Sequence, residues 1–163
     1  MTELSRPVVL DRIGAAGAVH VVEARPDELG PLAHRLMIPA VNRLWCEFRL
    51  RRGPGAVIAA EGRLEAEVVQ VCVLTLDEFA QPVHETFQVE FVPAGSESED
   101  DDPESPDQIP YEAGVVDLGE AAAEQLALAL DPYPKKPGAT EQAIEQNEED
   151  GPFAALAALR RKR

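Results

Sequence analysis

The sequence predicts an α+β fold, in which a twisted antiparallel sheet or small open barrel is covered by packing helices and carries flexible acidic segments. Several apolar–polar alternations follow one another at hairpin spacing, and two stretches carry helix start signals. The length of 163 residues is enough for one domain. We place this domain at residues 1–134, with an acidic loop at 95–109, and expect a flexible tail with a short C-terminal amphipathic helix at 135–163.

The first half of the chain supplies a strand, a helix and a second strand. The valine-rich residues 18–23 favour a short strand. Residues 26–36 favour a helix, which is either interrupted at Gly30 and Pro31 or begins only at Pro31. The clearest alternation of the chain comes next and is typical of a strand with one buried face, formed by Leu44, Cys46, Phe48 and Leu50.

Three more apolar segments continue the sheet. A Gly-Pro-Gly turn separates the preceding strand from the apolar residues 56–60, which indicates a hairpin. Residues 63–74 form a long predicted strand whose apolar side changes near Val68, as a bulge or burial of both faces would explain. Residues 83–92 form the next strand after another turn.

An acidic stretch and a helix follow. From Glu97 to Asp107 there are seven acids and no base, so a solvated loop is favoured over a divalent-metal site. Asp117 and Glu120 have the spacing of a capping box, and the helix that they start ends at the Asp131-Pro132 pair. Residues 153–159 then predict the short amphipathic helix of the tail.

Charge is distributed unevenly, with a formal net charge of −15. Residues 1–52 carry 8 basic and 6 acidic side chains, whereas residues 64–150 carry 2 basic and 23 acidic ones. An acidic surface repels phosphate, so any RNA contact would depend on two local groups of basic residues. These groups are Arg43, Arg49, Arg51 and Arg52, and Arg160 to Arg163.

The expected location is the cytoplasm, with no membrane partner. No apolar run approaches the roughly 18 residues that a membrane-spanning helix needs. The first residues also lack an apolar stretch of signal-peptide length.

Neither a metal site nor a catalytic site is predicted. The two cysteines, Cys46 and Cys72, are far apart, and the histidines are scattered, so the paired ligand spacings of structural zinc are missing. Both cysteines are therefore expected to be buried free thiols. The sequence contains no nucleophile motif and no phosphate-binding glycine loop. We assign no catalytic residue, no metal and no cofactor.

Two segments have residue patterns that are more specific than a strand or a helix alone needs. They are residues 71–76 with Phe79, and residues 117–134. In these segments the chain resembles the YceD-like family, the large ribosomal RNA subunit accumulation proteins of bacteria and plastids, and the resemblance extends over most of the chain. The residues that carry it are Cys72, Leu76, Asp117, Leu118, Gly119, Glu124, Leu126, Leu128, Leu130, Pro132, Tyr133 and Pro134.

The chain departs from the family pattern at one position. The second cysteine of the family's Cys-x-x-Cys-Leu segment falls at Thr75, so a metal or redox role is not carried over. Cys72 is expected to be a small packed side chain and Asp117 a helix cap. The motif leucines are expected to pack the helix, namely Leu126, Leu128 and Leu130.

The resemblance implies a role in accumulation of large-subunit (23S-type) ribosomal RNA, and hence in large ribosomal subunit assembly, without a catalytic step. A metal-dependent or enzymatic regulator of RNA processing is the alternative. The acidic charge favours a basic ribosomal protein or assembly factor as the partner over precursor rRNA. The candidate contact residues are Arg49, Arg51, Arg52, Glu120, Glu124, Lys135 and Lys136.

Overall fold

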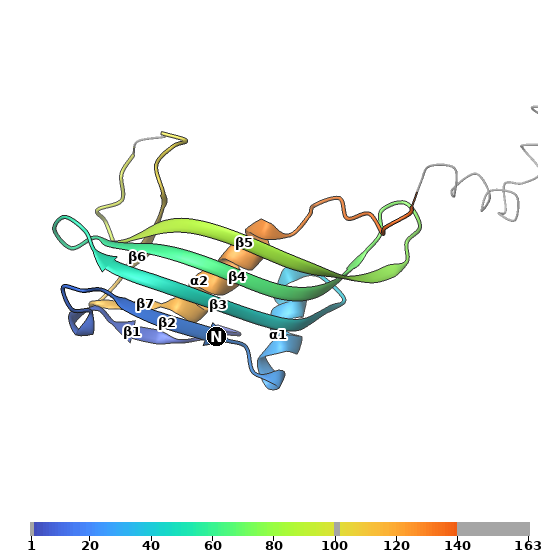
Figure 1. The fold of residues 1–163 in the computed structure, drawn as a ribbon, viewed down its shortest axis with the longest axis horizontal. Coiled ribbons are helices and arrows are strands. Elements are labelled where there is room, and N and C mark those ends of the chain that lie inside the picture. Colours follow the sequence, from blue (N-terminus) through green and yellow to red (C-terminus); the bar gives the residue numbers. More distant parts are fainter. Residues whose placement is uncertain (1, 100–101, 140–163) are drawn as a thin grey trace, which may run out of the picture.

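The computed structural model describes residues 2–99 and 102–139, and within them it contains a five-stranded sheet, a two-stranded sheet and two α-helices (Figure 1). The predicted α+β class is confirmed. A single 3₁₀ turn at Leu10–Arg12 follows the first strand. In chain order the elements are β1 (Pro7–Val9), β2 (Ala18–Glu23), α1 (Pro26–Leu36), β3 (Ala40–Arg52), β4 (Ile58–Val71), β5 (Glu78–Pro93), β6 (Asp107–Tyr111), β7 (Val115–Asp117) and α2 (Leu118–Ala129).

The large sheet has the order β2-β3-β4-β5-β6 and does not close into a barrel. Its first four strands are antiparallel neighbours, as predicted, but β6 pairs with β5 in parallel, from Val89 opposite Asp107 to Pro93 opposite Tyr111. The sheet is therefore mixed, and the expectation of a wholly antiparallel sheet is wrong at this edge. Residues 107–109, which we expected in the acidic loop, begin this edge strand.

Two further strands join the start of the chain to the second helix. β1 and β7 form an antiparallel pair of three residues each, from Pro7 opposite Asp117 to Val9 opposite Val115. Sequence patterns did not predict either strand, because three residues show no periodicity. The pair places the beginning of the chain directly beside the first turn of α2.

The long strand β4 keeps one face buried along its whole length. Its even-numbered residues are buried from Ile58 to Gln70, so the predicted change of side near Val68 is wrong. We offered a bulge near Val68 or burial of both faces as the explanation; the register irregularity lies on the partner strand β3, at Asn42, between the pairs that β3 forms with Val68 and with Glu67. Residues 56–60 and 63–74 thus contribute to one continuous strand instead of two.

A buried glutamine explains why the apolar pattern of β4 was misleading. Gln70 lies on the inner face with 5% exposure, and its Nε2 donates to the Asp131 carbonyl oxygen at 3.1 Å while its Oε1 accepts from Gln81. Since the amide is satisfied, burial costs little. The neighbouring valines Val71 and Val73 are 38% and 45% exposed.

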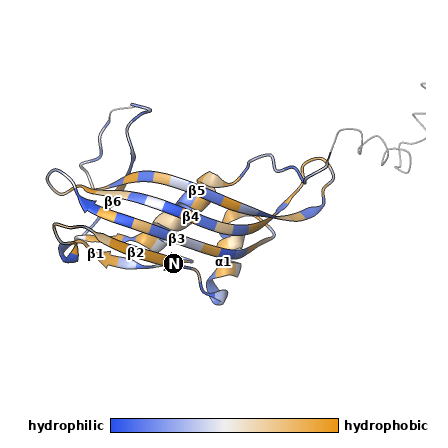
Figure 2. Cartoon of the chain, viewed as in Figure 1, coloured by the Kyte–Doolittle hydropathy of each residue, from blue (hydrophilic) through white to orange (hydrophobic). Residues whose placement is uncertain are grey.

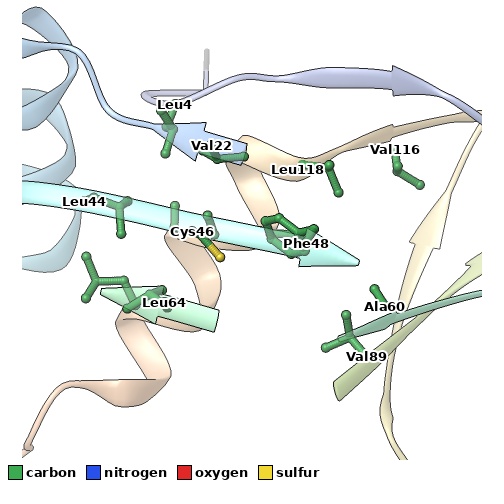
Figure 3. Packing of buried hydrophobic residues seen from close by; sticks show 14 of the residues in the cluster. Leu4, Val22, Leu44, Cys46, Phe48, Ala60, Leu64, Val89, Val116 and Leu118 are labelled. Atoms are coloured by element: carbon green, nitrogen blue, oxygen red, sulfur yellow. The ribbon is translucent and has the colours of Figure 1, made fainter. Parts of the chain in front are cut away.

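Both helices lie on the same face of the large sheet (Figure 1), and the core forms between them and the sheet. The alternating residues of β3 that we predicted to be buried, from Leu44 to Leu50, are at most 1% exposed. Figure 3 shows Phe48 and Leu64 packed in one cluster with Leu118 at the start of α2. The strands alternate between hydrophobic and hydrophilic residues along their length, as Figure 2 shows. The polar residues of β3 and β4 therefore form the opposite, open face of the sheet.

Helix α1 is continuous from Pro26 to Leu36, so Pro31 does not break it. Helix α2 begins after Asp117, whose carboxylate accepts from the backbone N–H groups of Gly119 at 2.9 Å and Glu120 at 3.2 Å. The predicted cap is confirmed, but the predicted capping box is not. The Glu120 side chain turns away to an ion pair with Arg35, with one oxygen 2.9 Å from Nη1. Among the described residues, no helix is long and apolar enough to span a bilayer.

Candidate protein-binding site

The two motif segments singled out in the sequence meet in space. The turn that follows β4 lies beside the chain that leaves α2 (Figure 1), and three contacts join them. Val73 N–H donates to the Pro134 carbonyl at 2.9 Å, Lys136 N–H donates to Cys72 Sγ at 3.3 Å, and Lys136 Nζ lies 3.2 Å from Asp77 Oδ2. The segment after α2 is therefore fixed to the sheet as far as Lys136.

Both cysteines are free and buried, as predicted. Burial raises the pKa of Cys46 to about 12. Burial also acts on Cys72, but hydrogen bonds from the Thr75 hydroxyl and from backbone N–H groups outweigh it and lower the pKa to about 7. The hydroxyl of Thr75, the position at which the resemblance leads us to expect a cysteine, thus donates to the thiolate of Cys72. Within the described residues no cluster of three or more His, Cys, Asp or Glu side chains could hold a metal ion.

The Asp-Leu-Gly motif has a structural task. Asp117 also accepts from Arg6 N–H at 2.7 Å and from the Ser5 hydroxyl at 2.6 Å, so one carboxylate caps α2 and holds the start of the chain. Leu118 is fully buried. A Cβ on Gly119 would lie 2.7 Å from the Leu4 carbonyl oxygen, so only glycine allows this close approach.

The motif leucines behave differently from one another. Leu126 is fully buried and Leu130 is half-buried against the core, as expected for packing residues. Leu128 is 71% exposed, so our assignment of a packing role to it is wrong. Its position on α2 faces away from the sheet, and two other apolar motif residues are also exposed, Leu76 at 77% and Tyr133 at 72%.

A groove of about 400 Å³ opens between β6, β7 and α2. Half-buried and buried apolar side chains line its floor, among them Ile109, Tyr111, Val115 and Ala121. All four charged residues that line it are acidic: Glu112, Asp117, Glu120 and Glu124. The groove therefore combines an apolar floor with a negative rim.

Two of the four acids are available to a partner. Asp117 is engaged as a cap, and Glu120 is neutralised by Arg35. Glu112 and Glu124 are exposed and form no ion pair within the described part of the chain. Although the Glu124 side chain is exposed, loss of part of its hydration beside the groove and the neighbouring Glu120 raise its pKa.

Comparison with models of known protein families shows to which family this chain belongs. The family model described as Large ribosomal RNA subunit accumulation protein YceD matches residues 60–160, which is more than half of the chain. The chain belongs to the YceD family. No curated protein and no solved structure matches it. The family description links this YceD-family protein to accumulation of the large ribosomal RNA subunit.

The matched span contains the groove but not the candidate arginines. All residues that line the groove lie between Phe91 and Glu124, within the YceD match, as do the turn at Cys72 and the segment at Lys136. Arg49, Arg51 and Arg52 precede it.

The structure does not bring the candidate arginines together as a free basic patch. Arg52 donates to the carbonyl oxygens of Ile13 at 2.9 Å and Leu10 at 3.0 Å, so two of its guanidinium nitrogens are engaged within the domain. Arg49 lies on the open sheet face, 3.1 Å from Glu47, while Arg51 is exposed on the same face. Acids share that face of β4 with them, namely Glu61, Glu65 and Glu67.

The remaining candidates divide between the two ends of α2. Glu120 and Glu124, which the sequence indicated as contact candidates on this helix, line the groove. Lys135 is exposed beyond the other end, and Lys136 is paired with Asp77. Sequence reasoning missed Glu112, because its place at the groove depends on β6 and β7, neither of which has a periodic signal.

Proposed function

We propose that this YceD-family protein is a non-catalytic adaptor in large ribosomal subunit assembly, and that it holds a basic protein partner in the groove between β6, β7 and α2. The observation that carries the proposal is the lining of the groove, where every charged residue is acidic and the floor is apolar. A basic protein segment with a few apolar side chains is the ligand class that complements both features.

Electrostatics and burial have different roles at this groove. The net charge of −15 attracts a basic partner and speeds encounter, and at physiological salt this attraction reaches about 8 Å. Glu112 and Glu124 then select for cations at contact distance. The apolar floor supplies the affinity, at about 25 cal/mol for each Å² of apolar surface removed from water.

Direct binding of precursor RNA is the weaker of the two mechanisms. Its candidate residues on β3 alternate with glutamates across the open sheet face, and the guanidinium of Arg52 is occupied by two carbonyl groups. A phosphate backbone would meet about as many acids as bases there.

The adaptor proposal is tested by capture of the proteins extracted from purified large ribosomal subunits. We expect the double variant Glu112→Lys/Glu124→Lys to retain at least ten-fold less basic protein than the wild type at low salt, with the difference shrinking as salt is raised. The matched control is Glu99→Lys/Glu104→Lys, which changes the net charge equally in the acidic loop. Equal losses in the two variants would contradict a role for the groove.

The alternative function, a metal-dependent or enzymatic regulator of RNA processing, has its own discriminating measurement. Elemental analysis of the purified protein reports any bound transition metal. Stoichiometric zinc that is lost in Cys72→Ala would favour the alternative.

A further inference from the structure

One segment of this chain has the chemistry that the groove selects. The described residues end at Ala139, and the sequence continues to Arg163. Residues 153–163 contain four basic side chains and no acid, and the four bases follow one another from Arg160 to Arg163. Ahead of them, apolar residues recur at intervals of three, at Phe153, Leu156 and Leu159.

The complementarity is specific to this segment of the tail. The preceding residues 140–152 contain five acids and no base, so the negative rim of the groove would repel them. The described surface contains basic side chains, but those of β3 are interleaved with acids. Residues 153–163 are thus the part of the chain in which apolar residues are followed by an uninterrupted basic cluster.

The connection is long enough for the segment to reach the groove. Residues 140–152 span up to about 45 Å when extended, at roughly 3.4 Å per residue. A domain of this size has a radius of gyration of about 14 Å. A covalent connection of 13 residues also raises the local concentration of the segment to the order of millimolar, so that even a weak contact would be populated.

We propose that residues 153–163 of this chain dock in the groove between β6, β7 and α2. The apolar residues Phe153, Leu156 and Leu159 cover the floor at Ile109, Tyr111 and Val115, and the terminal bases lie beside Glu112 and Glu124. If the proposed function holds, on which this consequence rests, the tail competes with the basic partner, and the partner must displace it.

Nuclear magnetic resonance of the full-length protein tests the docking directly. We expect nuclear Overhauser contacts between the Phe153 ring and the methyl groups of Ile109 and Val115. Leu156→Asp in the tail and Glu112→Lys/Glu124→Lys at the rim should each abolish these contacts. The control variant Leu76→Asp, on the exposed turn after β4, should leave them unchanged.

Three results would overturn the docking. Random-coil shifts of Phe153 without contacts would show that the segment is undocked. Contacts from Phe153 to Val73 or Leu76 would place it at the apolar end of the sheet instead. Contacts that appear only between differently labelled molecules in a mixed sample would assign the groove to a second copy of the chain.

The capture experiment separates this inference from the proposed function. With the tail docked, Leu156→Asp should raise the capture of basic ribosomal proteins several-fold, because the competitor is removed. Capture that depends on Glu112 and Glu124 but is unchanged by Leu156→Asp would refute the competition and leave the adaptor function standing. Phe153 contacts without any capture would refute the adaptor function and leave the docking standing.

Discussion

At the residue scale, two thiols of one small protein have opposite acidities because their surroundings differ. Cys46 lies in the apolar core between β3 and the helices, where nothing stabilises a thiolate. Cys72 lies in the turn after β4, where N–H groups and the Thr75 hydroxyl point to its sulfur. The sequence predicted that both are buried and free, but the hydrogen bonds of Cys72 come from a turn and a tail that no periodicity describes.

The two thiols should titrate separately. We expect one thiolate to form near pH 7, absent in Cys72→Ala, and no second thiolate in the folded protein below about pH 11. The ultraviolet absorbance of the thiolate measures both steps. The pKa of Cys72 is lower in the folded protein than in the unfolded chain, where it is about 8.5. The Cys72 thiolate therefore stabilises the fold fully above about pH 8.5, and this stabilisation is lost as pH falls through about 7. A joint titration of both thiols near pH 8.5 would contradict the assigned environments.

A buried carboxylate, that of Glu28, makes a second pH-dependent contribution to the stability of the fold. Glu28 accepts from both Arg6 Nη atoms at 2.8 and 2.9 Å and from Arg25 at 2.9 Å, so the pairing with Arg6, opposed by burial, lowers its pKa to about 2. Its stabilisation is present above the unfolded pKa of about 4.3 and is lost as pH falls toward 2.

Replacing that carboxylate should therefore change the acid stability. We expect Glu28→Gln to lower the free energy of unfolding at pH 7 by about 1–3 kcal/mol, since two arginines lose their charged partner. The difference from the wild type should shrink between pH 4 and pH 2. Urea unfolding at several pH values measures it, with Asp27→Asn, an exposed neighbour, as the control. A difference that stays constant down to pH 2 would contradict the lowered pKa.

At the element scale, strands with a long alternating pattern were predictable and short strands were not. The sequence predicts β2, β3, the end of α1 and both ends of α2 well, because apolar periodicity and caps are local signals. β5 begins at Glu78, five residues before the strand that we predicted at 83–92, where we expected a turn. β1, β6 and β7 depend on neighbours that are distant in sequence, and β6 contains Pro110, which is tolerated because β6 is at the sheet edge. We predicted a change of the buried side in β4 that does not occur, because the buried and hydrogen-bonded Gln70 interrupts the apolar pattern of that face.

One glycine of β4 limits how its neighbouring strands pack. A Cβ on Gly62 would lie 2.0 Å from the Phe87 ring, which rests edge-on against Phe48 with centroids 5.6 Å apart. We expect Gly62→Ala to destabilise the protein by about 1–3 kcal/mol, because the Phe87 ring must move. In a Phe87→Leu background the same change should cost at least about 1 kcal/mol less, as a double-mutant cycle from urea unfolding will show. Additive effects would contradict this contact.

At the scale of the whole molecule, charge and fold together determine which surface we propose for a partner. The sequence predicted Glu120 and Glu124 as contact candidates, but Arg35 neutralises Glu120 and the groove adds Glu112. The arginines of β3 were predicted from their clustering in sequence, yet the antiparallel register sets glutamates of β4 beside them. The sequence could therefore indicate the residues that α2 contributes to the candidate site. It could not indicate the residues of β6 and β7 on the other side of the groove, because their position depends on the parallel pairing of β6 with β5.

The central claim is that the acidic groove, and not the arginines of β3, supports accumulation of the large ribosomal RNA subunit. The most direct measurement is the ratio of large-subunit to small-subunit rRNA in cells that lack this gene and carry one of its variants. We expect Arg49→Gln/Arg51→Gln to restore the ratio like the wild type, and Glu112→Lys/Glu124→Lys to fail although it is folded and present at the same level. Restoration by the groove variant together with failure of the arginine variant would contradict the account.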